Sequence, residues 1–269
     1  KDSPQDAAAV TEDLHKLLKG AGISDPLILV GHSIGGPYTR TYVGKYGEQV
    51  AGLVMVDPSH PDQIARLGKV VSIDVHPKRA STLMHGANAL AWTGIVRFII
   101  AQGDKPKLRT PAETKRLGDA LVKAAAYAST SIRGSTSELD GFDRTMDQAR
   151  AVHSFGNRPL IVLTAMAPMK PEQLKGLSLK AEEGARFKQE WKTLHTEQAA
   201  FSTRGRQHIV PDATHYIQVD RPEVVIAAGD EKLVEELEHE HPEVDFQLAT
   251  DMEEQKLQIR DADAYYGWP

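Results

Sequence analysis

The chain contains no cysteine, which excludes disulfide bonds and thiolate chemistry together. It also lacks any apolar run near the ~18 residues that a membrane-spanning helix needs, and its longest apolar stretch, residues 91–101, is interrupted by Arg97. Positive charge is not in excess, because 32 Lys and Arg are outnumbered by 37 Asp and Glu. We therefore expect neither a membrane span nor a nucleic-acid partner, since phosphate recognition needs clustered basic residues.

The remaining composition is that of an ordinary folded protein. A chain of 269 residues with 41% hydrophobic and 26% charged residues is typical of one main globular domain. The beginning of the chain shows no basic stretch followed by an apolar one, so no secretory leader is recognised. We expect a cytoplasmic location.

The most informative segment is residues 26–36, which read PLILVGHSIGG. An apolar run typical of a buried strand leads there into the pentapeptide G-x-S-x-G, and a helix-compatible segment follows. This order is typical of a nucleophile elbow, a strained strand-to-helix turn that exposes a serine hydroxyl, in which Gly31 and Gly35 avoid a Cβ beside the turn. Ser33 is therefore the candidate nucleophile, and the backbone N–H of Ile34 is a candidate oxyanion donor.

Strand and helix patterns alternate along the chain. Short buried strands are predicted at residues 26–30, 51–56, 158–164 and 207–210. Amphipathic helices are predicted at residues 5–19 and 182–201. The alternation predicts an α/β fold with a parallel sheet covered on both faces, whose chemistry lies on loops at the carboxyl ends of the strands.

A long interruption separates the second predicted strand from the third. Residues 59–157 contain no comparable strand and show helical stretches at 90–101, 112–128 and 137–152, which predicts a helical cap. The expected division is a core of residues 1–58 and 158–229, a cap of residues 59–157, and a C-terminal α/β extension of residues 230–269.

A serine hydroxyl is a weak nucleophile until a base takes its proton, and that base needs an orienting group. His215 lies five residues past the fourth strand and is the candidate base. His32 is expected to pack at the elbow and is a candidate substrate contact, as is Trp92 of the cap. The other histidines considered read as surface residues, namely His60, His76, His85, His153 and His195.

The orienting acid has more than one candidate. Asp57 stands at the tip of the second strand, 24 positions beyond Ser33, and is preferred, although an Asp before a Pro also commonly caps a turn. Glu172 is the first acid after the third strand, and Asp62 is a further alternative.

Residues 5–228 resemble an α/β-hydrolase of the esterase and lipase kind. The matching motifs occur in the family's order and read GHSIGG at 31–36, LVMVDP at 53–58, PLIVL at 159–163 and THYI at 214–217. The resemblance implies a truncated α/β-hydrolase sheet with a cap, and a triad of Ser33, Asp57 and His215 that hydrolyses small or medium esters without a cofactor. A thioesterase, lactonase, amidase, perhydrolase or carbon–carbon bond hydrolase would use the same triad.

The chain departs from this family before the nucleophile strand. Family members usually have about four earlier strands, one of whose loops supplies part of the oxyanion hole. None precedes residue 26 here, so the second oxyanion donor has no assigned source and the nucleophile strand lies at a sheet edge. An apolar edge invites pairing, so we expect a homo-oligomer or coverage by the C-terminal segment. A catalytically impaired hydrolase that serves as an assembly module is the competing hypothesis.

The last 40 residues do not fit the hydrolase pattern. A polar helix at 231–240, an alternating strand at 244–250 and the ending ADAYYGWP resemble the start of the substrate domain of a D-2-hydroxyacid dehydrogenase. No dinucleotide fingerprint accompanies them, so no dehydrogenase activity is implied. The HEH sequence at 239–241 lacks the i, i+4 spacing of a zinc helix, and no metal is expected.

Overall fold

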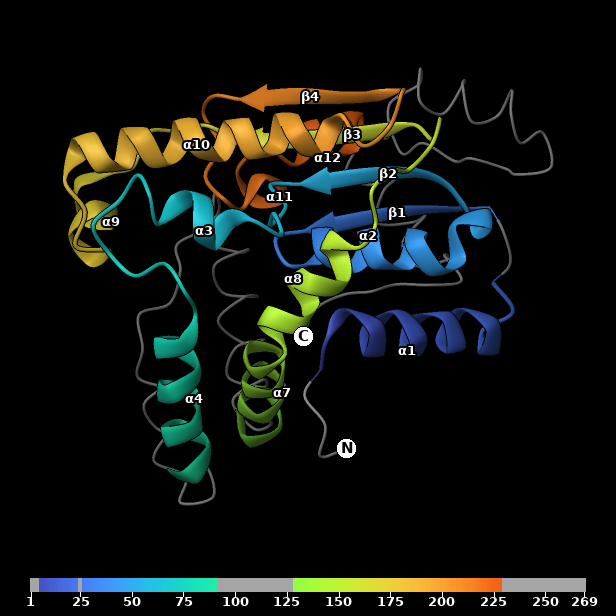
Figure 1. The fold of residues 1–269 in the computed structure, drawn as a ribbon, viewed down its shortest axis with the longest axis horizontal. Helices are drawn as coiled ribbons and strands as arrows, with labels where there is room; N and C mark the ends of the chain where they lie inside the picture. The colour runs from blue at the N-terminus through green and yellow to red at the C-terminus, as the bar shows by residue number, and fades with distance from the viewer. Residues whose placement is uncertain (1–4, 24–25, 91–127, 229–269) are drawn as a thin grey trace, which may run out of the picture. The chain divides into compact units, whose positions relative to one another are not determined.

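The structure is a computed structural model that describes residues 5–23, 26–90 and 128–228 (Figure 1). The described residues do not include Trp92 or the C-terminal extension. Of the helices expected at 90–101 and 112–128, residues 91–101 and 112–127 also lie outside them. The described part forms two compact units, one with residues 76–90 and 128–143 together with residues 5–6, and a larger one with the rest. The division into a core of residues 1–58 and 158–229 and a cap of residues 59–157 stays a prediction.

The larger unit is built on a parallel sheet of four strands, as predicted. The strands are β1 (Leu27–His32), β2 (Val50–Val56), β3 (Leu160–Ala165) and β4 (Gly205–Val210), in the order β1-β2-β3-β4. His32 pairs with Val56, and Val56 pairs with Leu163, so the carboxyl ends of the first three strands lie at one edge. This register brings the loops after the strands together.

Helices cover both faces of the sheet. One face packs against α1 (Ala7–Gly20), α2 (Gly35–Tyr46) and α10 (Ala181–Ala199), and the other packs against α11 (Ile217–Asp220) and α12 (Pro222–Ala227). The strand β2 is buried along its whole length. Leu53 and Met55 lie in the hydrophobic core on the side of α2 and α10, and Val54 and Val56 lie in the core on the side of α11 and α12. This alternation is what a strand with two buried faces requires.

Shorter helices complete the larger unit. They are η1 (Gly47–Gln49), α3 (Gln63–Leu67), α8 (Phe142–Arg150), whose first two residues fall in the smaller unit, and α9 (Pro171–Gly176). Figure 1 shows α10, the longest described helix, running along β3 and β4, and α3 contacts the same helix. The loop after β2 is thereby held against α10. No helix of the described part is long and apolar enough to cross a membrane.

The smaller unit contains α4 (Lys78–Leu90) packed against α7 (Ala128–Asp140). Ser81 and His85 of α4 both bond to the carboxylate of Asp140, at 2.7 and 3.1 Å. The sequence predicts one helix over residues 137–152, but the structure has a break between α7 and α8. A Cβ on Gly141 would lie 2.1 Å from the carbonyl oxygen of Gln5, so the break brings two segments closer than a side chain would permit.

Candidate active site

Ser33 occupies a strained turn between β1 and α2. Its φ of 54° lies in the left-handed region, which a non-glycine residue rarely adopts. A Cβ on Gly31 would lie 2.6 Å from the carbonyl oxygen of Gly35, so the first glycine of the motif is sterically required. Gly35 itself has open space around it, contrary to the sequence interpretation, whereas a Cβ on Gly36 would lie 2.5 Å from Cβ of Pro58.

Backbone hydrogen bonds fix this turn to the loop after β2. The N–H of Ser33 donates to the carbonyl of Val56 at 3.2 Å, and the N–H of Ser59 donates to the carbonyl of Ser33 at 2.8 Å. Within the described part of the chain, the N–H of Ile34 donates no hydrogen bond. It therefore remains available beside the serine hydroxyl.

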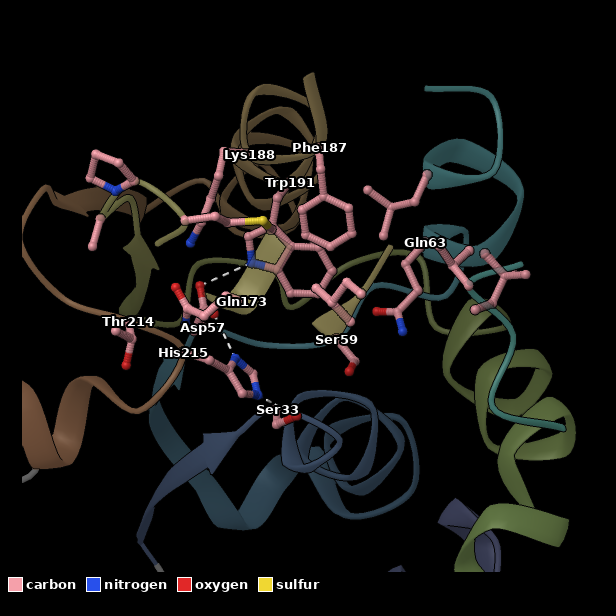
Figure 2. A pocket seen from close by; sticks show the side chains of 17 residues that line it. Ser33, Asp57, Ser59, Gln63, Gln173, Phe187, Lys188, Trp191, Thr214 and His215 are labelled. Carbon is pink, nitrogen blue, oxygen red and sulfur yellow. Dashed lines mark hydrogen bonds and ion pairs between the residues drawn. The ribbon is translucent and has the colours of Figure 1, made fainter. Parts of the chain in front are cut away.

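The structure brings Ser33, His215 and Asp57 into one hydrogen-bonded chain (Figure 2). Nε2 of His215 lies 2.9 Å from Oγ of Ser33, and Nδ1 lies 2.7 Å from Oδ2 of Asp57. The other acids considered from the sequence lie elsewhere, with Glu172 in the first turn of α9 and Asp62 at the start of α3. Of the candidate acids, Asp57 is the one that contacts the histidine.

Asp57 is buried, and both oxygens of its carboxylate have hydrogen-bond partners. Oδ1 accepts hydrogen bonds from the N–H of Ala165 at 2.9 Å and from Nε1 of Trp191 at 3.0 Å, while Oδ2 faces His215. Burial by itself would raise the pKa of Asp57, but the bond from His215, the field of His195 and these two donors outweigh it and hold that pKa below its usual range. The carboxylate can therefore stay ionised beside the imidazole.

The loop that carries His215 is held on both sides. The backbone N–H and the hydroxyl of Thr214 both donate to Oδ2 of Asp220, at 2.7 and 2.5 Å. Nε2–H of His32 donates to the carbonyl of His215 at 2.9 Å, and burial lowers the pKa of His32, which favours this neutral form. The structure thus gives His32 a contact with the loop that carries His215, and its role as a substrate contact stays a prediction.

The hydroxyl of Ser33 opens on a cavity of about 390 Å³ (Figure 2). This is within the range of small-ligand sites. Its polar lining includes Ser33, Ser59, Gln63, Lys188 and His215, and its apolar lining includes Ile64, Leu67, Met169, Leu177, Phe187 and Trp191. His32 is not part of this lining among the described residues.

The sequence model of the alpha/beta hydrolase family matches residues 2–228. The chain belongs to this family. Among solved structures, a thermophilic esterase from Thermogutta terrifontis is 17% identical with a TM-score of 0.53, over 87% of this chain and 74% of that one. A candidate lipase from Acinetobacter baumannii is 14% identical with a TM-score of 0.51, over 89% and 71% of the two chains. These likenesses show the fold, and no curated protein matches the chain.

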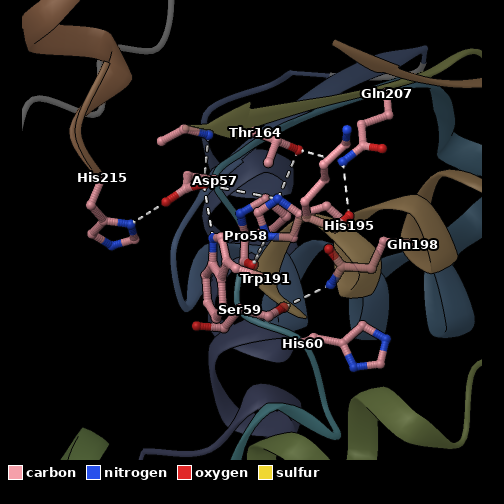
Figure 3. A network of polar contacts seen from close by, with 12 residues as sticks. Asp57, Pro58, Ser59, His60, Thr164, Trp191, His195, Gln198, Gln207 and His215 are labelled. Atoms are coloured by element: carbon pink, nitrogen blue, oxygen red, sulfur yellow. Dashed lines mark hydrogen bonds and ion pairs between the residues drawn. The ribbon is translucent and has the colours of Figure 1, made fainter. Parts of the chain in front are cut away.

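Besides the Ser33-His215-Asp57 chain, this α/β-hydrolase contains a Thr-His-Asp arrangement around the same carboxylate (Figure 3). Nδ1 of His195 lies 2.9 Å from Oγ1 of Thr164 and 3.9 Å from Oδ1 of Asp57. Nε2–H of His195 must donate to the carbonyl of Pro58 at 2.8 Å, so Nδ1 accepts from the threonine hydroxyl. Thr164 and His195 are both 0% exposed, so no substrate can reach this threonine. The hydrogen bond from His195 to Pro58 instead holds the loop after β2 in place.

Side chains on one face of α10 hold the loop after β2 in place. Lys188, Trp191, His195 and Gln198 follow one another at helical spacings of three and four residues, and all four contact the strand ends or the loop after β2. The prediction from the sequence that His195 and His60 lie at the surface is wrong, since they are 0% and 3% exposed. The i, i+4 spacing of Trp191 and His195 was the available signal.

No group of three or more His, Cys, Asp or Glu residues that could hold a metal ion is found within the described part of this hydrolase. The family match ends at residue 228, so it does not extend to residues 230–269.

Proposed function

We propose that this α/β-hydrolase is a serine carboxylic-ester hydrolase with Ser33 as nucleophile, His215 as general base and Asp57 as the orienting acid. The observation that carries the proposal is the continuous chain of hydrogen bonds from Oγ of Ser33 through the imidazole to the buried carboxylate. A neutral imidazole that accepts at Nε2 and donates at Nδ1 is the arrangement that acyl transfer to serine requires. The adjoining cavity supplies room for a small or medium ester.

In the proposed reaction, Nε2 of His215 takes the hydroxyl proton while Oγ of Ser33 attacks the ester carbonyl. Asp57 stabilises the imidazolium that forms. The imidazolium then gives its proton to the leaving alcohol, and an acyl-serine remains. Water, deprotonated by the same histidine, attacks the acyl group, and the proton returns to Ser33 as the carboxylic acid leaves. No cofactor takes part in these steps.

The oxyanion needs at least two donors, and we propose the N–H of Ile34 as one of them. The hydroxyl of Ser59 is our candidate for the second, because it lines the cavity and has no hydrogen-bond partner among the described residues. Thr214 also lines the cavity, but its hydroxyl already donates to Asp220. If Ser59 has this role, Ser59→Ala should lower kcat by roughly 10²- to 10³-fold while leaving Ser33 in place.

The first experiment is intact-mass analysis after exposure to a fluorophosphonate probe. Wild-type protein should gain one equivalent of label, and Ser33→Ala should gain none. Hydrolysis of 4-nitrophenyl butyrate, followed in parallel, should be lost in Ser33→Ala and in His215→Ala. A folded protein that neither labels nor turns over esters would instead support the competing hypothesis of an impaired hydrolase acting as an assembly module. A panel of thioesters, lactones and amides separates the hydrolases that would share this triad.

The sheet edge supports a further proposal, that the protein forms a homo-oligomer. Among the strands that the structure describes, β1 lies at the edge of the sheet, and Val30 on it is 60% exposed. Apolar, unpaired edges are sites of association unless they are covered. Light scattering coupled to size-exclusion chromatography should give a mass above that of one chain, and Val30→Lys should reduce it. A monomer for both proteins would contradict self-association.

A further inference from the structure

Lys188 is a cation inside the proposed active-site cavity. It extends from α10, which also carries Phe187 and Trp191 (Figure 2), and it lines the same cavity as the apolar side chains of Met169 and Phe187. Its Nζ donates one hydrogen bond, to the carbonyl oxygen of Ala165 at 3.0 Å, and forms no ion pair with any residue in the described ranges. An ammonium group has three donors, so the described residues engage one of them.

The acidic residue of the cavity lining, Asp57, forms no ion pair with this cation. Asp57 lines the same cavity, but both of its oxygens are engaged by His215, Trp191 and the N–H of Ala165. Burial lowers the pKa of Lys188, and the field of Asp57 opposes that lowering only in part. A half-buried ammonium with unused donors is costly unless an anion compensates it.

The carbonyl of Ala165 does not by itself explain a lysine at this position. A neutral donor could satisfy that oxygen without the cost of placing a charge against apolar side chains. The charge has a use if an anionic group enters the cavity, because a hydrogen bond between an ammonium and a carboxylate is stronger than one between neutral groups. Asp57, the other charged residue of the described lining, belongs to the proposed triad.

We propose that Lys188 binds a carboxylate of the substrate, so that the preferred substrates are esters that carry a free carboxylate, such as monoesters of dicarboxylic acids. The proposal rests on the proposed esterase function and assigns its substrate class. Because Ser33 and Lys188 are both fixed on the framework of the larger unit, the preference has an optimum chain length between the ester carbonyl and the carboxylate.

The test compares each monomethyl ester of the malonate-to-adipate series with its dimethyl ester, by acid release at constant pH. For the wild type we expect kcat/KM to favour the charged ester by roughly 10- to 100-fold at the best chain length. Lys188→Met should bring that ratio to near one, and Lys188→Arg should retain part of it. Lys192→Met, on the same helix but outside the cavity lining, is the matched control and should keep the wild-type ratio. Carboxymethyl butyrate places the charge on the alcohol side and distinguishes the two halves of the ester.

A second measurement separates this proposal from the proposed function. Calorimetric titration with the free dicarboxylate of best chain length should show binding to the wild type and at least tenfold weaker binding to Lys188→Met. That result without hydrolysis of any ester would retain the anion site and reject the esterase. Ester hydrolysis with an equal ratio in wild type and Lys188→Met, or dicarboxylate binding that does not depend on Lys188, would overturn the proposal. A purely structural lysine would lower both rates together and leave the ratio unchanged.

Discussion

Two buried histidines should make this hydrolase lose stability in mildly acidic solution. Burial lowers the pKa of His195 to about 4 and that of His60 to about 4, from an ordinary value of 6.5. Both are held as acceptors at Nδ1, His195 from the hydroxyl of Thr164 and His60 from the N–H of Asp62. A proton at Nδ1 would remove these bonds and place an additional charge in the interior.

The sign and size of the effect follow from proton linkage. Between pH 6.5 and 4 the unfolded chain binds protons at these histidines and the folded chain does not, so stability falls as the pH falls through this window. Each pKa unit corresponds to about 1.4 kcal/mol, and a change from pH 7 to pH 5 covers about 1.5 units of the window. Each histidine should therefore cost about 2 kcal/mol, which is a large share of the ~5–15 kcal/mol typical of a domain.

The assay is urea unfolding at pH 7, 6 and 5, with the slope of the unfolding free energy against pH as the readout. His195→Gln keeps a donor for the carbonyl of Pro58 and should reduce the loss between pH 7 and pH 5 by about 2 kcal/mol, whatever its own stability. His208→Gln, at an exposed position of β4, should keep the wild-type slope. The depressed pKa of Asp57 acts at lower pH, below its ordinary value of 3.8. If His195→Gln and wild type show the same slope, the buried-histidine argument is wrong.

Four other substitutions test the candidate site. Asp57→Asn should lower kcat by about 10⁴-fold, because the amide favours the wrong tautomer of His215, and full activity would return Glu172 to consideration as the acid. Trp191→Phe removes one of two donors to Oδ1 of Asp57 and should lower the unfolding free energy by about 1.5–3 kcal/mol. An unchanged unfolding free energy would mean that this hydrogen bond does not contribute to stability. Gly31→Ala should cost about 1–3 kcal/mol from its clash, whereas Gly35→Ala should be neutral or gain up to about 1 kcal/mol, both read as Tm shifts.

Apolar runs and the turn residues that follow them in the sequence predicted most of the sheet and the residues of the candidate triad. The strands β1 and β2 end in turn residues at fixed positions, and a parallel sheet places such ends at a common edge, so Ser33 and Asp57 could be paired without coordinates. The acid remained ambiguous because the chain alone does not say which strand end faces His215. That choice depends on the loop after β4, whose path is set by contacts with Asp220 and His32.

The features that the sequence analysis missed depend on tertiary packing. The histidine at position 195 looks like any polar residue of an amphipathic helix, and only the placement of α10 against the loop after β2 shows that it is buried. Lys188 likewise reads as a solvent-exposed charge until the helix is docked. Periodicity identifies which residues share a helix face, but it does not identify what that face packs against.

One face of α10 therefore carries residues for two separate properties of the proposed reaction, its rate and its selectivity among esters. Trp191 and His195 act on Asp57 and its loop, so substitutions there should change kcat for every ester together. Lys188 lies one turn earlier, in the cavity wall, so its substitution should change the ranking of esters. Because all three side chains are fixed by the same helix, a change that shifts α10 along β3 should alter rate and selectivity at once. Point substitutions that remove a single polar group on this face should separate the two.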